Sequence, residues 1–185
     1  GESECTDCMP GTFSEKPGST QCIPCAPGTY GSEPGSVTCT LCNAGKYSVD
    51  ASSMTCTDCT AGTFSKPGKA SCSMCTPGTY AEYAGSSVCS MCAAGTFSNR
   101  IGTDMCTPCK EGTYSAATGS VDCKVCMPGF YSSHSGSTVC NECHAGGYSN
   151  FSGASECMFC IAGKYSGDGA SSCTNCSPGS YSDSV

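Results

Sequence analysis

The sequence has few of the large apolar side chains from which a globular core is built. Among 185 residues there is no Trp and a single Leu, Leu41, and 22 of the residues in the 38% hydrophobic fraction are Cys. So little aliphatic surface cannot offset the conformational entropy lost on folding. This scarcity excludes an ordinary globular core, and covalent cross-links must take its place.

Basic clusters and long hydrophobic runs are also missing. The 8 Lys and Arg stand singly among 15 Asp and Glu, so we expect no nucleic-acid partner. No stretch approaches the roughly 20 apolar residues of a membrane span, and neither end has a signal-peptide pattern. We therefore expect no membrane span in this segment, and the start at Gly1 indicates an excised or mature piece.

Cysteine is what the sequence has in excess. The chain holds 22 Cys together with 24 Gly, which is typical of a disulfide scaffold. Cytosolic thiols are kept reduced, so cystines at this density belong to the secretory path or beyond it. The sequence predicts an extracellular protein, either secreted or on the cell surface.

The cysteines define a tandem repeat. Cys-x-x-Cys pairs recur with eight steps of 17 residues and two of 16, the shorter steps lying in 59–72 and 160–173. We expect 1–185 to be a single continuous array of these repeats and a fragment of a longer array. The repeats begin at residues 5, 22, 39, 56, 72, 89, 106, 123, 140, 157 and 173.

Each repeat has the pattern of a small hairpin. A first glycine, often after Pro, predicts a tight turn with positive φ, and a stretch such as Gly28–Tyr30 predicts a strand of three or four residues. A second glycine turns the chain back, except in the third repeat, where Ser52 stands instead. The predicted fold is small, disulfide-rich and mostly irregular, with short β-hairpins, in an elongated tandem-repeat rod of eleven 16–17-residue units.

One aromatic side chain recurs in each repeat. One interpretation is a stripe on which sugars stack, and the other, which we favour, is that each ring covers a cystine and packs on the next repeat. The positions are Phe13, Tyr30, Tyr47, Phe64, Tyr80, Phe97, Tyr114, Tyr131, Tyr148, Tyr165 and Tyr181.

The residues leave two disulfide registers open, because bridges within each Cys-x-x-Cys would stabilise a scaffold little. The alternative to the register we favour joins two whole pairs, as in Cys5–Cys22 with Cys8–Cys25, but it leaves one of eleven pairs without partners and predicts an odd–even alternation that the repeats lack. In the favoured register Cys5 and Cys176 pair outside the segment. Its bridges are Cys8–Cys22, Cys25–Cys39, Cys42–Cys56, Cys59–Cys72, Cys75–Cys89, Cys92–Cys106, Cys109–Cys123, Cys126–Cys140, Cys143–Cys157 and Cys160–Cys173.

The repeat resembles a known family. Cys-x-Pro-Gly-Thr-Tyr at Cys25–Tyr30, with Gly-Ser-x-x-Cys closing the loop at Gly35–Cys39, is similar to the ephrin-receptor-like cysteine-rich repeat over essentially the full chain. That resemblance implies a large extracellular or surface protein and names no ligand. The loop is also similar to the first loop of tumour necrosis factor receptor modules, which supports the favoured register. Those receptors alternate module types, whereas this chain repeats one.

Other chemistry has little support in the sequence. Two Cys-x-x-Cys pairs can hold zinc, but zinc modules rarely tile eleven times, so we expect cystines and no metal. His134 and His144 have no repeated carboxylate or serine partner, and Asp50, Asp104 and Asp168 form no calcium loop. We expect no enzymatic activity and no cofactor.

Glycosylation is a further expectation. Asn150-Phe151-Ser152 is an N-linked acceptor sequence, and Asn175-Cys176-Ser177 fits the same rule but places a cysteine in the middle. Ser and Thr in the loops are candidates for O-linked glycans.

Uniform repeats favour a structural function. We expect a stiff segment of an extracellular filament or surface fibre, with self-association or further repeats as its partners. The alternative is the stalk of a receptor or adhesin that presents a ligand-binding domain outside this segment.

Overall fold

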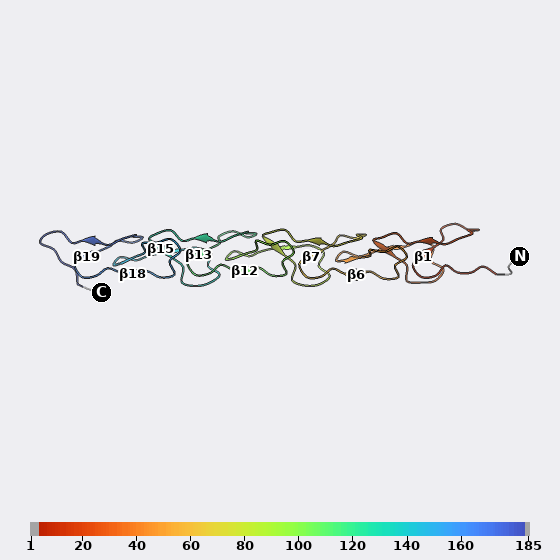
Figure 1. The fold of residues 1–185 in the computed structure, drawn as a ribbon, viewed down its shortest axis with the longest axis horizontal. Helices are drawn as coiled ribbons and strands as arrows, with labels where there is room; N and C mark the ends of the chain where they lie inside the picture. Colours follow the sequence, from red (N-terminus) through yellow and green to blue (C-terminus); the bar gives the residue numbers. More distant parts are fainter. Residues whose placement is uncertain (1–3, 184–185) are drawn as a thin grey trace. The chain divides into compact units, whose positions relative to one another are not determined.

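The computed structural model describes residues 4–183, which fall into two compact units. Of these residues, the first unit comprises 4–90 with Arg100–Met105, and the second comprises Met91–Asn99 with 106–183. Each unit is a succession of small hairpins joined by turns (Figure 1), and within residues 4–183 there is no helix. The predicted mostly irregular, hairpin-based and disulfide-rich fold is confirmed.

Every strand has two residues, whereas the sequence predicts strands of three or four. The strands are β1 (Thr12–Phe13), β2 (Ile23–Pro24), β3 (Thr29–Tyr30), β4 (Thr40–Leu41), β5 (Lys46–Tyr47), β6 (Thr57–Asp58), β7 (Thr63–Phe64), β8 (Ser73–Met74), β9 (Thr79–Tyr80), β10 (Ser90–Met91), β11 (Thr96–Phe97), β12 (Thr107–Pro108), β13 (Thr113–Tyr114), β14 (Lys124–Val125), β15 (Phe130–Tyr131), β16 (Asn141–Glu142), β17 (Gly147–Tyr148), β18 (Met158–Phe159), β19 (Lys164–Tyr165) and β20 (Thr174–Asn175).

Each hairpin pairs the dipeptide that ends in the recurring aromatic with the two residues between the next pair of cysteines. In β3 and β4, which are antiparallel, Thr29 lies opposite Leu41 and Tyr30 opposite Thr40. The same pairing joins β13 to β14 in the second unit. The Cys-x-x-Cys segment is thus itself a strand, and its two cysteines lie at the two ends of that strand.

Backbone bonds to the next repeat explain why the strands are so short. Gly28 has a φ of 86°, which ends β3 at one side because extended structure requires negative φ. At the other side the N–H of Gly31 donates to the carbonyl of Ser53, 3.0 Å away, in the following repeat. The ladder therefore leaves its own hairpin after two residues.

Adjacent repeats are joined by a recurring set of three backbone hydrogen bonds. In the first unit Gly28 donates to Ser48 at 2.8 Å, Cys42 donates to the carbonyl of Gly28 at 2.9 Å, and Ser52 donates to Cys25 at 2.9 Å. We call this set the inter-repeat triplet.

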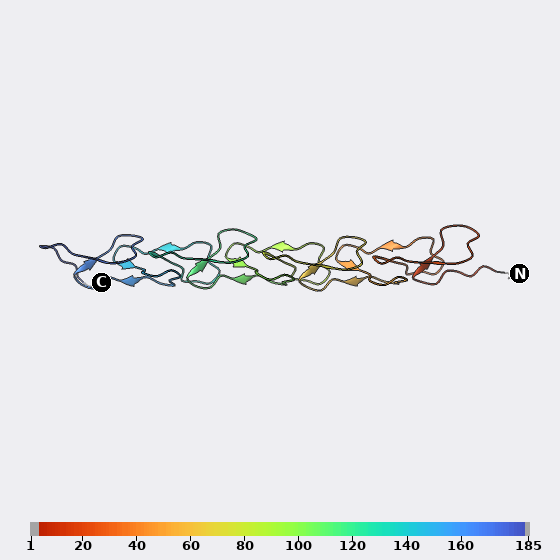
Figure 2. The same cartoon turned by 45° about the horizontal axis from the view of Figure 1, so that its top comes forward.

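The same triplet recurs in the second unit. There Gly112 donates to Ser132, Cys126 to Gly112, and Gly136 to Cys109, at 2.7 to 2.9 Å. Figure 2 shows the hairpins of each unit following one another in chain order along one direction. The triplets therefore join consecutive repeats within each unit.

The interior of each unit consists of cystines and serines. The largest fully buried side chains among the described residues are Cys25, Cys42, Cys59, Cys75, Cys92, Cys109, Cys126, Cys143, Ser65, Ser132 and Ser149. The buried hydroxyls bond within the chain: Ser65 Oγ donates to the carbonyl of Lys46 at 2.8 Å, and Ser48 Oγ lies 2.6 Å from Ser53 Oγ. No buried side-chain polar atom in residues 4–183 lacks a partner.

Candidate functional site

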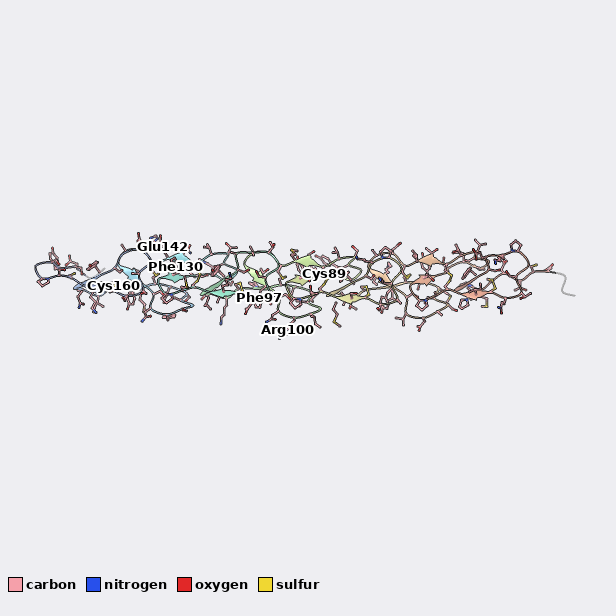
Figure 3. All side chains as sticks on the ribbon, turned by 90° about the horizontal axis from the view of Figure 1, so that it is seen from above. Cys89, Phe97, Arg100, Phe130, Glu142 and Cys160 are labelled. Carbon is pink, nitrogen blue, oxygen red and sulfur yellow. A yellow bond between two sulfur atoms is a disulfide. The ribbon has the colours of Figure 1, made fainter. Side chains whose placement is uncertain are left out.

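The ten disulfides are the main chemical feature of the described chain. They join Cys8–Cys22, Cys25–Cys39, Cys42–Cys56, Cys59–Cys72, Cys75–Cys89, Cys92–Cys106, Cys109–Cys123, Cys126–Cys140, Cys143–Cys157 and Cys160–Cys173. This is the register that connects the second cysteine of one repeat to the first of the next. Figure 3 displays the side chains and labels Cys89 and Cys160, one from each unit.

The disulfides have nearly the same geometry in every repeat. Their Cα–Cα distances are 5.7 or 5.8 Å, even in Cys59–Cys72 and Cys160–Cys173, whose separation is 13 residues instead of 14. The missing residue therefore changes the length of the loop and leaves the geometry at its base unchanged. In each bridge within residues 25–157 the second cysteine of a repeat is buried, and the cysteine that it joins is half-buried.

Two cysteines have no partner within the described residues. Cys5 is exposed and Cys176 is half-buried, and both are free thiols. They stand at the repeat positions whose equivalents elsewhere are bridged. Their pairing with cysteines outside the segment stays a prediction.

The recurring aromatics lie at the surface of the repeats. Tyr30, Tyr47, Tyr114 and Tyr148 are half-buried, whereas the Tyr165 side chain is exposed. Each ring stands opposite the residue that follows a bridged cysteine, as Tyr30 stands opposite Thr40 beside Cys39. The rings thus lie beside the cystines and leave one side open to solvent.

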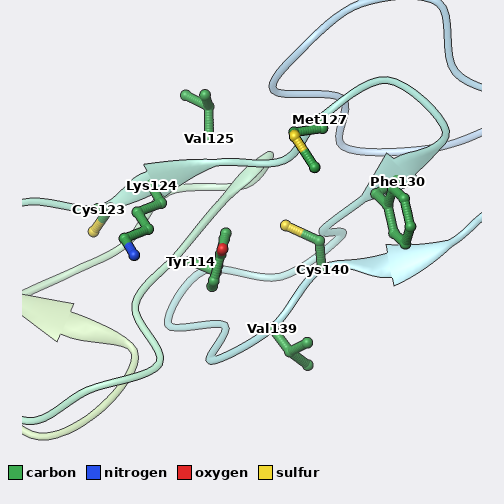
Figure 4. A pocket seen from close by; sticks show the side chains of 8 residues that line it. All are labelled: Tyr114, Cys123, Lys124, Val125, Met127, Phe130, Val139 and Cys140. Carbon is green, nitrogen blue, oxygen red and sulfur yellow. The ribbon is translucent and has the colours of Figure 1, made fainter.

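Two surface grooves lie beside such aromatics in the second unit. The Tyr114 groove has a volume of about 640 Å³ and is lined by Tyr114, Cys123, Lys124, Val125, Met127, Phe130, Val139 and Cys140. Figure 4 shows Tyr114, Met127 and Cys140 around the same space. The Asn150 groove has a volume of about 270 Å³ and is lined by Tyr148, Asn150, Phe159, Ile161, Lys164, Ser172 and Cys173.

These grooves are equivalent sites two repeats apart. Tyr148 occupies the repeat position of Tyr114, Phe159 that of Val125, and Ile161 that of Met127. Sequence analysis did not find them, because each groove takes its walls from three consecutive repeats. The signal was present as apolar residues between and just after the cysteines.

Of the ionisable residues singled out in the sequence, His144 and Asp168 lie close together at the surface. His144 is 88% exposed at its side chain, and its Nδ1 lies 3.9 Å from Asp168 Oδ1. Asp168 also accepts a hydrogen bond from the N–H of Ala145 at 2.7 Å. His134 Nδ1 is hydrogen-bonded to the Ser133 hydroxyl at 2.8 Å. Within residues 4–183 no three His, Cys, Asp or Glu side chains are grouped to hold a metal ion.

Two charge interactions were not predicted from the sequence. Lys46 Nζ lies 2.7 Å from Asp58 Oδ1 across β5 and β6, where the two residues are directly opposed. A hydrogen bond from Tyr83 to Glu82, followed by the charge of that carboxylate, raises the pKa of the fully exposed Tyr83 hydroxyl. Both are surface interactions, of a kind that contributes little to stability.

The two N-linked acceptor sequences are accessible. Asn150 and Asn175 are both exposed, and Asn150 lies at the rim of the Asn150 groove. Asn175 belongs to β20 and is followed by the free thiol of Cys176. Accessibility of the side-chain amide is the first requirement for glycan attachment.

Hairpins closed by cystines between consecutive repeats define a disulfide-stapled tandem-repeat protein. A family model described as tyrosine-protein kinase ephrin type A/B receptor-like matches residues 1–38, 62–103 and 95–139. The chain belongs to this ephrin-receptor-like cysteine-rich family, as its repeat motif predicts. No curated protein matches the sequence.

The family and the cystines together place the chain in a broad class. Cystines at this density persist in oxidising surroundings, and the ephrin-receptor-like repeat is of an extracellular type. The chain is therefore a repeat segment of the extracellular or cell-surface kind, structural or stalk-like. No helix in the described residues has the length and apolar character to cross a membrane.

Proposed function

We propose that the chain is a stiff, non-enzymatic segment of an extracellular filament or surface fibre. The inter-repeat triplet is the observation that carries this proposal. In both units it joins first glycines such as Gly28 and Gly112 to the following repeat, and a cystine closes the loop between the same repeats. A joint with three backbone hydrogen bonds and a covalent bridge resists bending, because bending must stretch several bonds at once.

Serine-rich interiors suit a load-bearing role more than a binding role. The buried hydroxyls of Ser65 and Ser166 donate to carbonyls of the preceding repeat, those of Lys46 and Gly147, each at 2.8 Å. These bonds again connect neighbouring repeats. The open grooves contain no paired acid and base of the kind that catalysis requires.

Small-angle scattering combined with sedimentation velocity tests whether the segment is a stiff rod. We expect a cross-section of constant radius and a maximum dimension that scales with the number of repeats when repeats are added or removed in whole units. A compact particle, or a dimension that grows only as the square root of repeat number, would contradict a stiff rod.

The second candidate function is the stalk of a cell-surface receptor or adhesin. The family description, which refers to receptors, is the observation that favours it. A filament segment should associate end to end or side by side as its concentration rises, whereas a stalk should stay monomeric. Electron microscopy of native surface material separates the two, since a fibre repeats the chain and a stalk ends in a different domain.

A further inference from the structure

An aromatic side chain stands exposed in the turn of the fifth repeat. Tyr83, between β9 and β10, is 69% exposed, and Glu82 beside it is exposed as well. Phe151 occupies the same repeat position in the ninth repeat and is 53% exposed, but its neighbours, Asn150 and Ser152, are uncharged. We call residues 82–85 the Tyr83 turn. It combines an exposed ring with an exposed carboxylate.

The Tyr83 turn is held in place by backbone bonds and by its own side chains. The N–H of Gly85 donates to the carbonyl of Cys59, in the preceding repeat, at 2.8 Å. Ser86 Oγ donates to the carbonyl of Tyr83 at 2.6 Å, and Ala81, at the start of the turn, is buried. A ring on a fixed backbone loses little conformational freedom when it binds, which favours a contact made through it.

The Tyr114 groove offers a complementary surface in the second unit. Tyr114 and Lys124 are directly opposed across β13 and β14, so their side chains lie on the same face of that hairpin. Met127 and Val139, 68% and 61% exposed, line the same groove (Figure 4). Its volume of about 640 Å³ lies within the range of small-molecule sites, roughly 300–1,000 Å³, so one tyrosine ring can enter.

Charge complementarity indicates which exposed ring fits this groove. The chain has a net charge of −7, so two copies repel each other unless a cation meets a carboxylate where they touch. Lys124 is exposed, and no salt bridge within residues 4–183 uses its ammonium group. The carboxylate of Asp122, close to it in the sequence, accepts a hydrogen bond from the N–H of Cys123. Glu82 supplies the missing negative charge next to an aromatic ring.

We propose that the Tyr83 turn of one copy of the chain docks in the Tyr114 groove of a second copy. The two tyrosine rings pack on each other in an offset or edge-to-face arrangement. The Glu82 carboxylate pairs with the Lys124 ammonium group and keeps the hydrogen bond from the Tyr83 hydroxyl, since a carboxylate accepts several donors. The inference rests on the proposed function, because it names a contact between the chains of the fibre.

Such a contact can continue from copy to copy. The Tyr83 turn belongs to the first unit and the Tyr114 groove to the second, so the contact joins two different surfaces. After one contact forms, one copy still has a free groove and the other a free turn. A heterologous contact of this kind adds further copies without limit unless it closes into a ring.

One contact alone is weak. A tyrosine ring buries about 150–250 Å², whereas a stable interface buries about 1,200 Å² or more. In a fibre each chain uses its turn and its groove at the same time, and the neighbouring chains keep the partners close. Association of free chains should therefore need a high protein concentration and should weaken as salt screens the charge pair.

Sedimentation equilibrium of the oxidised chain at increasing concentration and low salt tests the contact. Tyr83→Ser removes the ring, and Glu82→Lys or Lys124→Glu places like charges together. The double variant Glu82→Lys/Lys124→Glu restores the charge pair with its signs reversed. Phe151→Ser is the matched control, because it removes an exposed ring at the same repeat position.

We expect Tyr83→Ser and each single charge reversal to raise the dissociation constant about tenfold or more, as the loss of a central anchor does. The double reversal should return it to within about threefold of the unmodified chain. Phe151→Ser should leave it unchanged.

Photo-cross-linking locates the contact on the partner. Replacement of Tyr83 by p-benzoylphenylalanine keeps an aromatic ring in the turn, and a mixture of isotopically labelled and unlabelled chains identifies cross-links between copies. We expect these cross-links to reach the residues of the Tyr114 groove, Met127 among them. The same replacement of Phe151 is the control and should give no cross-link to that groove.

Three results would overturn the inference. Cross-links from position 83 to another surface, or a double reversal as weak as the single reversals, would exclude this contact and leave a self-associating fibre intact. A chain that stays monomeric at every concentration would exclude the contact and favour the stalk. A compact particle in small-angle scattering would instead contradict the stiff segment from which the inference starts.

Discussion

Ser52 is the only residue other than glycine with positive φ within residues 4–183, at 63°. It takes the place of the second glycine of its repeat, and its N–H still donates to Cys25 at 2.9 Å. An L-residue in the left-handed region has its Cβ close to a carbonyl oxygen, at a cost of roughly 1–2 kcal/mol. The third repeat therefore contains local backbone strain.

Ser52→Gly should stabilise the chain by about 1 kcal/mol, because it relieves this strain and loses part of the gain to the larger freedom of glycine in the unfolded chain. Urea unfolding followed by circular dichroism measures the change. The control is Gly18→Ser at the same repeat position, where φ is 73° and no atom lies within 4 Å of the added Cβ. We expect Gly18→Ser to lower the free energy of unfolding by a similar amount. If neither variant changes it, the turn adapts to either residue.

The first glycine of a repeat meets a different constraint. A Cβ on Gly45 would overlap the carbonyl group of Gly85, two repeats further along, whereas a Cβ on Gly163 would meet nothing within 4 Å. Both glycines have positive φ, 83° and 78°, so they share the backbone penalty. The comparison separates conformational strain from close packing between repeats.

Gly45→Ala should therefore destabilise the chain by about 2–4 kcal/mol, and Gly163→Ala by about 1–2 kcal/mol. The measurement is urea unfolding of each variant and of the unmodified chain under the same conditions. Equal losses in the two variants would mean that the contact between Gly45 and Gly85 is not close enough to matter.

Residue patterns predicted the turns correctly and missed the contacts between repeats. The positions of both glycines, and Ser52 as the exception among the second glycines, follow from aligning the repeats, because positive φ selects for glycine. The hydrogen-bond acceptors of the Gly31 and Ser48 N–H groups do not follow from that alignment, since an N–H group can bond within its own hairpin or to the next repeat. A sequence period gives the spacing of repeats and does not specify which atoms meet across the boundary.

At the scale of the element, each hairpin depends on its cystine. A two-stranded hairpin of two residues per strand has no independent stability in water. Cys42 is fully buried, so the Cys42–Cys56 bridge also fills the interior of its repeat. The loop between the two cysteines contains β5 and its exposed cation, Lys46.

The double variant Cys42→Ser/Cys56→Ser should lose about 3 kcal/mol of local stability, the amount associated with closing a loop of ~15 residues. Cleavage by trypsin after Lys46 should then be roughly a hundredfold faster, as far as cleavage follows the open population. Met54→Ser, a change at an exposed position of the same loop, should leave the rate unchanged. An unaltered rate in the double variant would show that the inter-repeat triplet alone holds the loop closed.

The two grooves are also features of the element. Neither was predicted, because Tyr148 and Phe159 are 11 positions apart and come to line the same groove only when β17 pairs with β18. The repeat pattern did indicate hairpins, but it assigned no strand to the residues between the cysteines. These two residues form a strand in which one side chain is turned to solvent. That arrangement can be deduced only when the register of the hairpin is known.

At the scale of the whole molecule, the absence of a hydrophobic core has a direct consequence for reduction. The buried apolar side chains of the described residues are cysteines apart from Ala81 and Ala154. Once the cystines are opened, little apolar surface remains to keep the chain folded.

Reduction under native conditions should therefore unfold both units, with loss of tyrosine circular dichroism and of slow amide exchange. The measurement is a dithiothreitol titration with alkylation and mass analysis at each step. The control is an equal concentration of the oxidised reagent. Persistent slow exchange in a fully alkylated chain would mean that the backbone hydrogen bonds suffice without the bridges.

Because each cystine joins two consecutive repeats, one wrong bridge removes a cysteine from each of two native bridges. Every bridge joins cysteines that are consecutive in the chain, so native partners are separated by only 13 or 14 residues. A bridge formed wrongly between Cys39 and Cys42 would leave Cys25 and Cys56 as free thiols, because their native partners would be joined to each other. One such error thus opens two loops and leaves a complementary pair of thiols, which can attack the misplaced bridge. The array can correct its pairing over the length of two repeats without unfolding the rest.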